Sequence, residues 1–208
     1  MDHAADGGEI QVGGEYFVHF FAPTSLTPMR KFVTFVLDVS GSMTKGHKLY
    51  EVKDAMRKIL RDMTPDDYFS VIAFADGVTV WETKEKENVR FAAAATSANV
   101  DSAINFVNKL RANGATNVYD ALERALKDVY EARNQGRPES KEQTTETVPD
   151  LIFFLTDGRP TTGKFIKENE VLHELSRVRL TWMYVVCWAN VFDCFYLTFQ
   201  SSLTCVNL

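Results

Sequence analysis

The sequence has few of the features that mark specialised classes of protein. Its three cysteines, Cys187, Cys194 and Cys205, all lie near the carboxyl terminus. An odd number of cysteines confined to one end does not indicate a disulfide framework, so their pairing and the redox compartment stay open. There is no Asn-x-Ser/Thr sequon, and the first residues lack the apolar segment of a secretory signal. We therefore expect no signal peptide in this chain, which is equally compatible with a fragment of a longer protein.

An excess of basic residues is also lacking. The formal net charge is -5, and no basic stripe stands out along the chain. Nucleic acid is therefore not an expected partner, because its phosphates are bound mainly by clustered lysine and arginine. The composition, 45% hydrophobic and 25% charged, is that of an ordinary globular domain, and 208 residues suffice for one sizeable core.

What the sequence does contain is a series of short apolar runs that alternate with amphipathic stretches. Residues 32–37 and 151–155 are rich in Val, Ile and Phe and predict buried central strands. The pattern as a whole predicts an α/β fold: a doubly wound, mostly parallel sheet flanked by helices, of the Rossmann-like type. Further strands are expected at 15–22, 68–75, 78–81 and 180–189, and helices at 48–63, 98–110, 118–132 and 168–178.

These elements suggest three parts of unequal character. Residues 1–29 form a lead-in with one strand, and residues 30–189 form the domain. Residues 190–208 are an atypical apolar tail. From Leu180 onward the only charged residue is Asp193. A membrane-spanning tail is not favoured, because the polar side chains of this segment are costly in hydrocarbon. We instead expect an incomplete carboxyl terminus that covers the last strand imperfectly and leaves apolar surface exposed.

Hydroxyl and carboxyl side chains follow the two central strands. Asp38, Ser40 and Ser42 come directly after the first, Asp157 follows the later one, and Thr116 precedes a predicted helix. In an open α/β sheet, the carboxyl ends of the strands lie along one edge, where ligands bind. Hard oxygen donors of this kind suit Mg²⁺, Mn²⁺ or Ca²⁺ better than zinc or copper.

In this order, Asp-x-Ser-x-Ser, a distant threonine and a distant aspartate resemble the metal-ion-dependent adhesion site of von Willebrand factor type A domains. The resemblance covers about residues 14–180 and is greatest to the inter-alpha-trypsin inhibitor heavy chains. From Leu180 onward the sequence departs from that family, whose glycine turn and further elements are missing here. The stretches that carry the likeness to the heavy chains are Gly14–Pro23, Phe35–Met43, Lys53–Ala55, Ile59–Leu60 and Phe153–Gly158.

The resemblance implies a ligand set and a mode of action. Ser40, Ser42 and Thr116 would offer hydroxyl oxygens, while Asp38 and Asp157 would bind the ion directly or through water, with Mg²⁺ the expected ion and Mn²⁺ or Ca²⁺ as alternatives. Neutral hydroxyls leave such an ion under-neutralised, so it can recruit an acidic side chain from a protein partner. This is binding and not catalysis, and it needs no catalytic residue and no organic cofactor. The resemblance further implies a secreted, extracellular protein linked to hyaluronan-matrix components and protease-inhibitor complexes.

Several alternatives are open at individual positions. Thr116 could instead cap the following helix, and Asp120 is expected to be an ordinary acid of that helix's first turn. Gly158–Lys164 fits the first seven positions of a phosphate-binding loop, but Phe165 stands where Ser or Thr should hold Mg²⁺. Nucleotide binding is therefore a minor alternative.

Two further function classes can be weighed. Ser40 and Ser42 lack the Gly-x-Ser-x-Gly elbow of a serine hydrolase, so an enzyme is not expected. An intracellular metal-dependent scaffold domain is the main alternative to an adhesive one, because nothing in this chain fixes secretion.

Overall fold

A computed structural model describes residues 9–13, 16–20, 30–82, 92–134, 150–158, 160–164 and 182–187. The predicted helix at 168–178, the tail at 190–208 and most of the polar stretch at 133–149 lie outside these residues.

The main sheet is mostly parallel, as the sequence predicts. Strand β3 lies at its centre, between β4 on one side and β7 on the other, and β8 pairs with β7; these four strands are mutually parallel. The short strands β5 and β6 run antiparallel to β4 and close that edge. The bounds are β3 Phe32–Asp38, β4 Tyr68–Phe74, β5 Val78–Val80, β6 Ala93–Ala94, β7 Asp150–Thr156 and β8 Trp182–Cys187.

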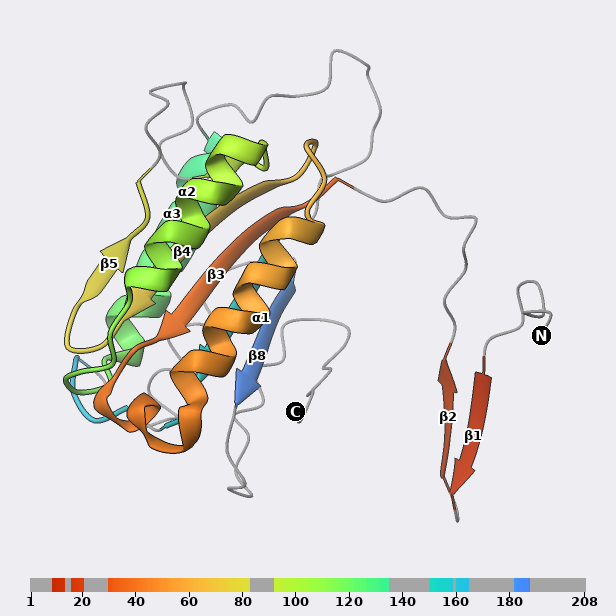
Figure 1. Cartoon of the computed structure of the whole chain (residues 1–208), viewed down its shortest axis with the longest axis horizontal. Coiled ribbons are helices and arrows are strands. Elements are labelled where there is room, and N and C mark those ends of the chain that lie inside the picture. The colour runs from red at the N-terminus through yellow and green to blue at the C-terminus, as the bar shows by residue number, and fades with distance from the viewer. Residues whose placement is uncertain are drawn as a thin grey trace.

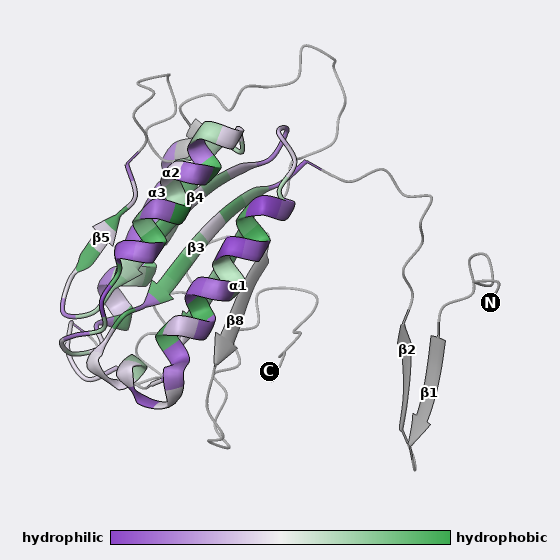
Figure 2. Cartoon of the chain, in the orientation of Figure 1, coloured by the Kyte–Doolittle hydropathy of each residue, from purple (hydrophilic) through white to green (hydrophobic). Residues whose placement is uncertain are grey.

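Helices cover both faces of this sheet (Figure 1). Helices α1 (Lys48–Asp62) and α2 (Ser97–Lys109) pack on one face and α3 (Val118–Asn134) packs on the other. β3 is buried along its whole length. In α1 and α2, hydrophobic residues alternate with hydrophilic ones, as expected of helices with one face on the sheet (Figure 2). Two apolar cores result, one on each face, and this confirms the doubly wound architecture.

The amino-terminal part differs from the prediction of a lead-in with one strand. The structure has two strands there, β1 (Glu9–Gly13) and β2 (Tyr16–Phe20), which pair antiparallel as a separate two-stranded sheet. The sequence predicted only the aromatic strand β2. β1 was missed because it has only two apolar residues, Ile10 and Val12, so its strand pattern is too short to recognise without its partner.

The order of the strands reverses at β3. The chain passes from β3 through α1 to β4 on one side, but β7, reached later, pairs on the opposite side of β3. β3 and β7 are therefore neighbouring parallel strands at the point where the strand order reverses, and the loops that follow them leave the same edge of the sheet. Such a switch point is where ligands bind in open α/β sheets.

Candidate metal centre

The first loop of the site leaves the sheet at the carboxyl end of β3. Asp38, the last residue of that strand, is fully buried, and its Oδ1 accepts a hydrogen bond from the Ser40 backbone nitrogen at 2.7 Å. The chain then enters a 3₁₀ turn, η1 (Gly41–His47), which leads directly into α1. This short bond holds the Asp38 carboxylate against Ser40 at the strand end.

The second loop, which follows β7, meets the first through side chains. The Thr156 hydroxyl donates to Asp38 Oδ2 at 2.6 Å, and the Ser42 hydroxyl donates to Asp157 Oδ1 at 2.6 Å. The hydroxyls of Ser40 and Ser42 lie 2.9 Å apart. The structure therefore brings four of the five predicted residues, Asp38, Ser40, Ser42 and Asp157, into one hydrogen-bonded cluster.

The fifth residue, Thr116, belongs to the loop before α3 and is joined to its neighbours through its backbone. Its nitrogen donates to the Thr161 hydroxyl at 2.8 Å, and its carbonyl accepts from the Thr161 nitrogen at 2.9 Å. Thr116 is only 4% exposed. Its hydroxyl makes no hydrogen bond to any part of the chain that the structure describes. That hydroxyl is thus an available oxygen donor.

The alternative role of Thr116 as a helix cap is wrong. Asn117 caps α3 instead: its Oδ1 accepts from the Asp120 nitrogen at 3.2 Å, and its Nδ2 donates to Asp120 Oδ2 at 2.7 Å. Asp120 is a first-turn acid of that helix, as predicted from the sequence. Asparagine and threonine are both preferred at helix N-caps, so the sequence alone could not decide whether Thr116 or Asn117 caps α3.

Two glycines allow the first and third loops to approach each other. The Gly41 nitrogen donates to the Gly114 carbonyl at 2.9 Å, and a Cβ on Gly41 would lie 3.3 Å from that oxygen. Gly114 has a φ of +81°, and a Cβ there would collide with the Asp76 carboxylate. A side chain at Gly114 would therefore push the loop that carries Thr116 away from the turn between β4 and β5, which carries Asp76.

The cluster contains two carboxyl groups that are fully buried, those of Asp38 and Asp157. Burial raises the pKa of the Asp38 carboxyl, and hydrogen bonds from Thr156 and Ser40 offset only part of that rise. Asp157 has a fully buried side chain, and its Oδ2 accepts a hydrogen bond from the Lys48 ammonium at 2.7 Å. The cluster thus holds two buried carboxylates and one lysine, which pairs with Asp157, so it carries negative charge that a cation would neutralise.

The donor set suits a hard divalent cation. It consists of two carboxylates and three hydroxyls, and oxygen ligands of this kind are those that Mg²⁺ prefers. Among the described residues there is no cluster of three or more His, Cys, Asp or Glu side chains, so a site for a softer metal has no candidate there. The free hydroxyl of Thr116 and the charge of the two aspartates together fit such an ion.

Two participants in the cluster were not predicted from the sequence. Thr156 precedes a predicted ligand and holds Asp38, and Lys48 begins α1 and reaches Asp157. A threonine at the end of a strand and a lysine on a helix are common, so neither gave a signal. Their roles depend on contacts across 118 and 109 residues of sequence.

The loop that resembles a phosphate-binding motif is used differently. Thr161 is tied to Thr116, and the Lys164 ammonium lies 3.5 Å from the Tyr119 hydroxyl and 5.2 Å from the centre of its ring. The loop therefore contacts the start of α3, and its lysine faces an aromatic ring.

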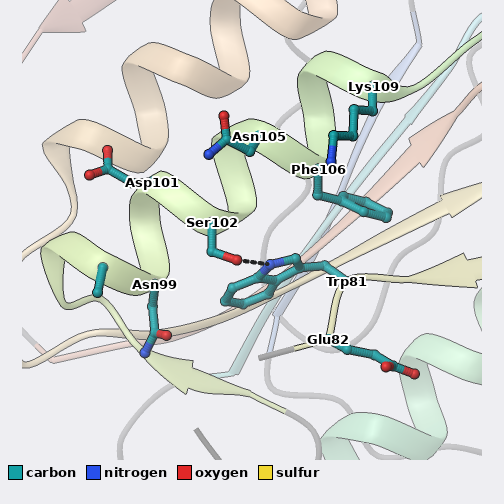
Figure 3. Close-up of a pocket in the computed structure, with 9 residues that line it drawn as sticks. Trp81, Glu82, Asn99, Asp101, Ser102, Asn105, Phe106 and Lys109 are labelled. Carbon is teal, nitrogen blue, oxygen red and sulfur yellow. Dashed lines mark hydrogen bonds between the residues drawn. The ribbon is translucent and has the colours of Figure 1, made fainter. Parts of the chain in front are cut away.

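A hollow elsewhere on the surface has a different character (Figure 3). It is lined by Trp81, Glu82 and one side of α2. Trp81 is 6% exposed, stacks on Phe69 and donates from its indole nitrogen to the Ser102 hydroxyl at 3.2 Å. These contacts explain Trp81 as part of the core, and the hollow has no cluster of convergent ligands like that around Asp38.

Within the described residues, no helix combines the length and apolar character needed to cross a membrane.

Comparisons with known proteins find similar domains. A family model described as the von Willebrand factor type A domain matches residues 33–191. Inter-alpha-trypsin inhibitor heavy chain H4 of Homo sapiens is 39% identical over 164 residues, which are 79% of this chain and 16% of that protein. Heavy chain H6 of Homo sapiens is 43% identical over 158 residues, which are 75% of this chain and 11% of that protein. The chain thus spans about one sixth or less of the length of these relatives.

Solved structures show the same fold at lower identity. A von Willebrand factor type A protein from Catenulispora acidiphila superposes with a TM-score of 0.55 at 19% identity, covering 77% of this chain and 33% of that one. The conserved hypothetical protein BatB from Bacteroides thetaiotaomicron gives a TM-score of 0.51 at 16% identity, covering 76% of this chain and 66% of that one.

Proposed function

Because the chain belongs to the von Willebrand factor type A family, we propose that it is a protein-binding domain whose binding depends on a divalent cation. The observation that carries the proposal is the hydrogen-bonded cluster of Asp38, Ser40, Ser42 and Asp157 at the switch point of the sheet. Thr116, whose hydroxyl is an available donor, completes the set. Mg²⁺ is the proposed ion, with Mn²⁺ and Ca²⁺ as alternatives.

The proposed mechanism follows from the donors. A bound divalent cation would supply an electrophilic centre that attracts a carboxylate. Three of its five protein ligands are neutral hydroxyls, so the two aspartates can only just balance its charge before any other cation is counted. An acidic side chain of a partner protein therefore gains a strong charge-assisted contact at this site. Thr156 and the Ser40 backbone nitrogen hold Asp38 in place, so the donors keep their arrangement before a partner arrives.

The proposed setting comes from the relatives. Similarity to inter-alpha-trypsin inhibitor heavy chains supports an extracellular protein linked to hyaluronan-matrix and protease-inhibitor complexes. The alternative is an intracellular scaffold domain that uses the same ion-dependent contact. A secretory signal upstream in the complete gene product would favour the extracellular setting, and a complete product without one would favour the alternative.

A titration tests the cation site directly. Mg²⁺ or Mn²⁺ is added to the wild-type chain, to Asp38→Ala and to Thr116→Ala, and heat and thermal stability are recorded. We expect saturable binding to the wild type, at least a hundred-fold weaker binding to Asp38→Ala and about ten-fold weaker binding to Thr116→Ala. An equal response in all three would remove the site.

Thr44→Ala provides the matched control. Thr44 is exposed and lies in the same 3₁₀ turn, where its hydroxyl donates to the Gly41 carbonyl at 2.8 Å. It has no place in the proposed ligand set, so this variant should bind Mg²⁺ like the wild type. A loss as large as that of Thr116→Ala would mean that general damage to the loops, and not a lost ligand, explains the effect.

A further inference from the structure

The two carboxylate oxygens of Asp157 have different partners, one of which is Lys48. Its ammonium lies 2.7 Å from Oδ2, while Oδ1 accepts the hydroxyl of Ser42. The Asp157 side chain is fully buried, and that of Lys48 is 25% exposed. The lysine thus sits at the back of the carboxylate, and the oxygen that remains is the one that faces the hydroxyl cluster.

The place of Lys48 in the chain is unfavourable for a lysine. It is the first residue of α1, where the helix dipole presents positive charge and acids are preferred. The two residues before it, Gly46 and His47, both have left-handed backbone angles, with φ of 61° and 62°. For His47 this conformation is strained, and backbone strain concentrates at functional sites. Helix stability therefore does not explain a lysine here, whereas its contact with Asp157 does.

We propose that Lys48 is a built-in counter-ion of the cation site: it directs Oδ1 of Asp157 toward the ligand cluster and lowers the affinity for divalent cations. The inference rests on the proposed function and adds a regulating residue to that site. Two aspartates, one lysine and a divalent cation leave one net positive charge. Lys48 therefore weakens the binding of the ion and strengthens the attraction for an acidic partner once the ion is bound.

The test separates the effect of the charge of Lys48 from that of its shape. Lys48→Met keeps the length of the side chain and removes its charge, while Lys48→Arg keeps the charge. Calorimetric titration should show Mg²⁺ binding about ten-fold tighter in Lys48→Met and within about two-fold of the wild type in Lys48→Arg. Unfolding in EDTA, measured first, establishes that each variant is folded.

A second measurement isolates the electrostatic cause. Ca²⁺ and Tb³⁺ are similar in size but differ in charge, so removing a nearby positive charge should favour Tb³⁺ more. We expect Lys48→Met to tighten Ca²⁺ about ten-fold and Tb³⁺ about thirty-fold, with Tb³⁺ followed by its luminescence. Equal gains for both ions would overturn the electrostatic argument.

The outcomes separate this inference from the proposed function. If the wild type binds Mg²⁺ and Lys48→Met binds it equally or more weakly, the counter-ion role is wrong and the cation site stands. Binding by Lys48→Met that is tighter than that of the wild type supports the inference, including the case where only the variant binds measurably. If neither binds, the proposed function fails and the inference fails with it.

Discussion

Each end of the parallel sheet holds a buried aspartate that is paired with a lysine. At the carboxyl end, Asp157 pairs with Lys48 at 2.7 Å; at the opposite end, Asp67 pairs with Lys31 at 2.8 Å. Both aspartate side chains are fully buried, and the two lysines are exposed to similar degrees, 25% and 34%. By distance and burial alone, the two pairs are nearly the same.

The remaining hydrogen-bond donors differ. Asp67 also accepts from the backbone nitrogens of Lys31 and Thr64, at 3.2 and 2.9 Å. The aspartates at the other end rely more on hydroxyls, because Ser42 donates to Asp157 and Thr156 donates to Asp38. A backbone amide can only donate, whereas a hydroxyl can rotate and offer its oxygen to a cation.

The pKa directions follow this difference. Burial alone would raise the pKa of Asp67, but hydrogen bonds from Lys31 and Thr64 hold it below its ordinary value of 3.8. Burial raises the pKa of Asp38, and its hydrogen bonds do not compensate. One end of the sheet therefore stabilises its carboxylate with the fold alone. The other end keeps buried charge that the proposed cation would stabilise, and functional sites commonly carry such a cost.

The largest expected effect comes from breaking the Asp67 end. Asp67→Ala leaves the partly buried nitrogens of Lys31 and Thr64 without their acceptor, and we expect a loss of about 3 kcal/mol in the free energy of unfolding. Urea denaturation in EDTA measures it. Asp66→Ala is the matched control, because the Asp66 side chain is 79% exposed and its ion pair with Arg30 is long, at 3.9 Å. A loss below about 1 kcal/mol in Asp67→Ala would mean that this end is not a structural anchor.

The corresponding change at the site should have the opposite sign. In Asp38→Asn, the amide can still accept from the Ser40 nitrogen and can donate to the Thr156 hydroxyl, while the buried charge is gone. We expect the free energy of unfolding in EDTA to be unchanged or to rise by about 1 kcal/mol. Added Mg²⁺ should raise the thermal midpoint of the wild type and not that of the variant. A destabilised variant that still responds to Mg²⁺ would contradict the comparison.

A pH series tests the direction of the Asp67 shift. A carboxyl whose pKa is lower in the folded state contributes stability above its unfolded pKa, and that stability is lost as pH falls through the folded value. The stability difference between wild type and Asp67→Asn should therefore be constant from pH 7 to about 5. It should shrink as the pH falls toward and below 3.8, where half of the unfolded groups hold a proton. A difference that grows as the solution becomes more acidic would reverse the assignment.

The sequence predicted one end of the sheet far better than the other. β3 and the pattern of Asp38, Ser40 and Ser42 could be predicted, because an apolar run that stops at regularly spaced polar residues is a local signal. The contacts of Thr156 and Lys48 could not, because each depends on residues more than a hundred positions away. Asp67 gave no signal either, since a carboxylate in a turn looks solvated until its burial is known.

The smallest expected effect sharpens the comparison most, because it sets the two lysines side by side. Lys31→Met leaves Asp67 with two backbone donors, and Lys48→Met leaves Asp157 with the Ser42 hydroxyl, so each should cost about 1 kcal/mol in EDTA. Saturating Mg²⁺ should recover the loss in Lys48→Met, since the ion replaces the missing positive charge beside Asp157. Saturating Mg²⁺ should leave the difference in unfolding free energy between the wild type and Lys31→Met unchanged, because Asp67 lies at the other end of the sheet. Chemical denaturation of both variants with and without Mg²⁺ decides the matter: equal recovery in the two would mean that the ion stabilises the fold generally and that the lysines do not differ in role.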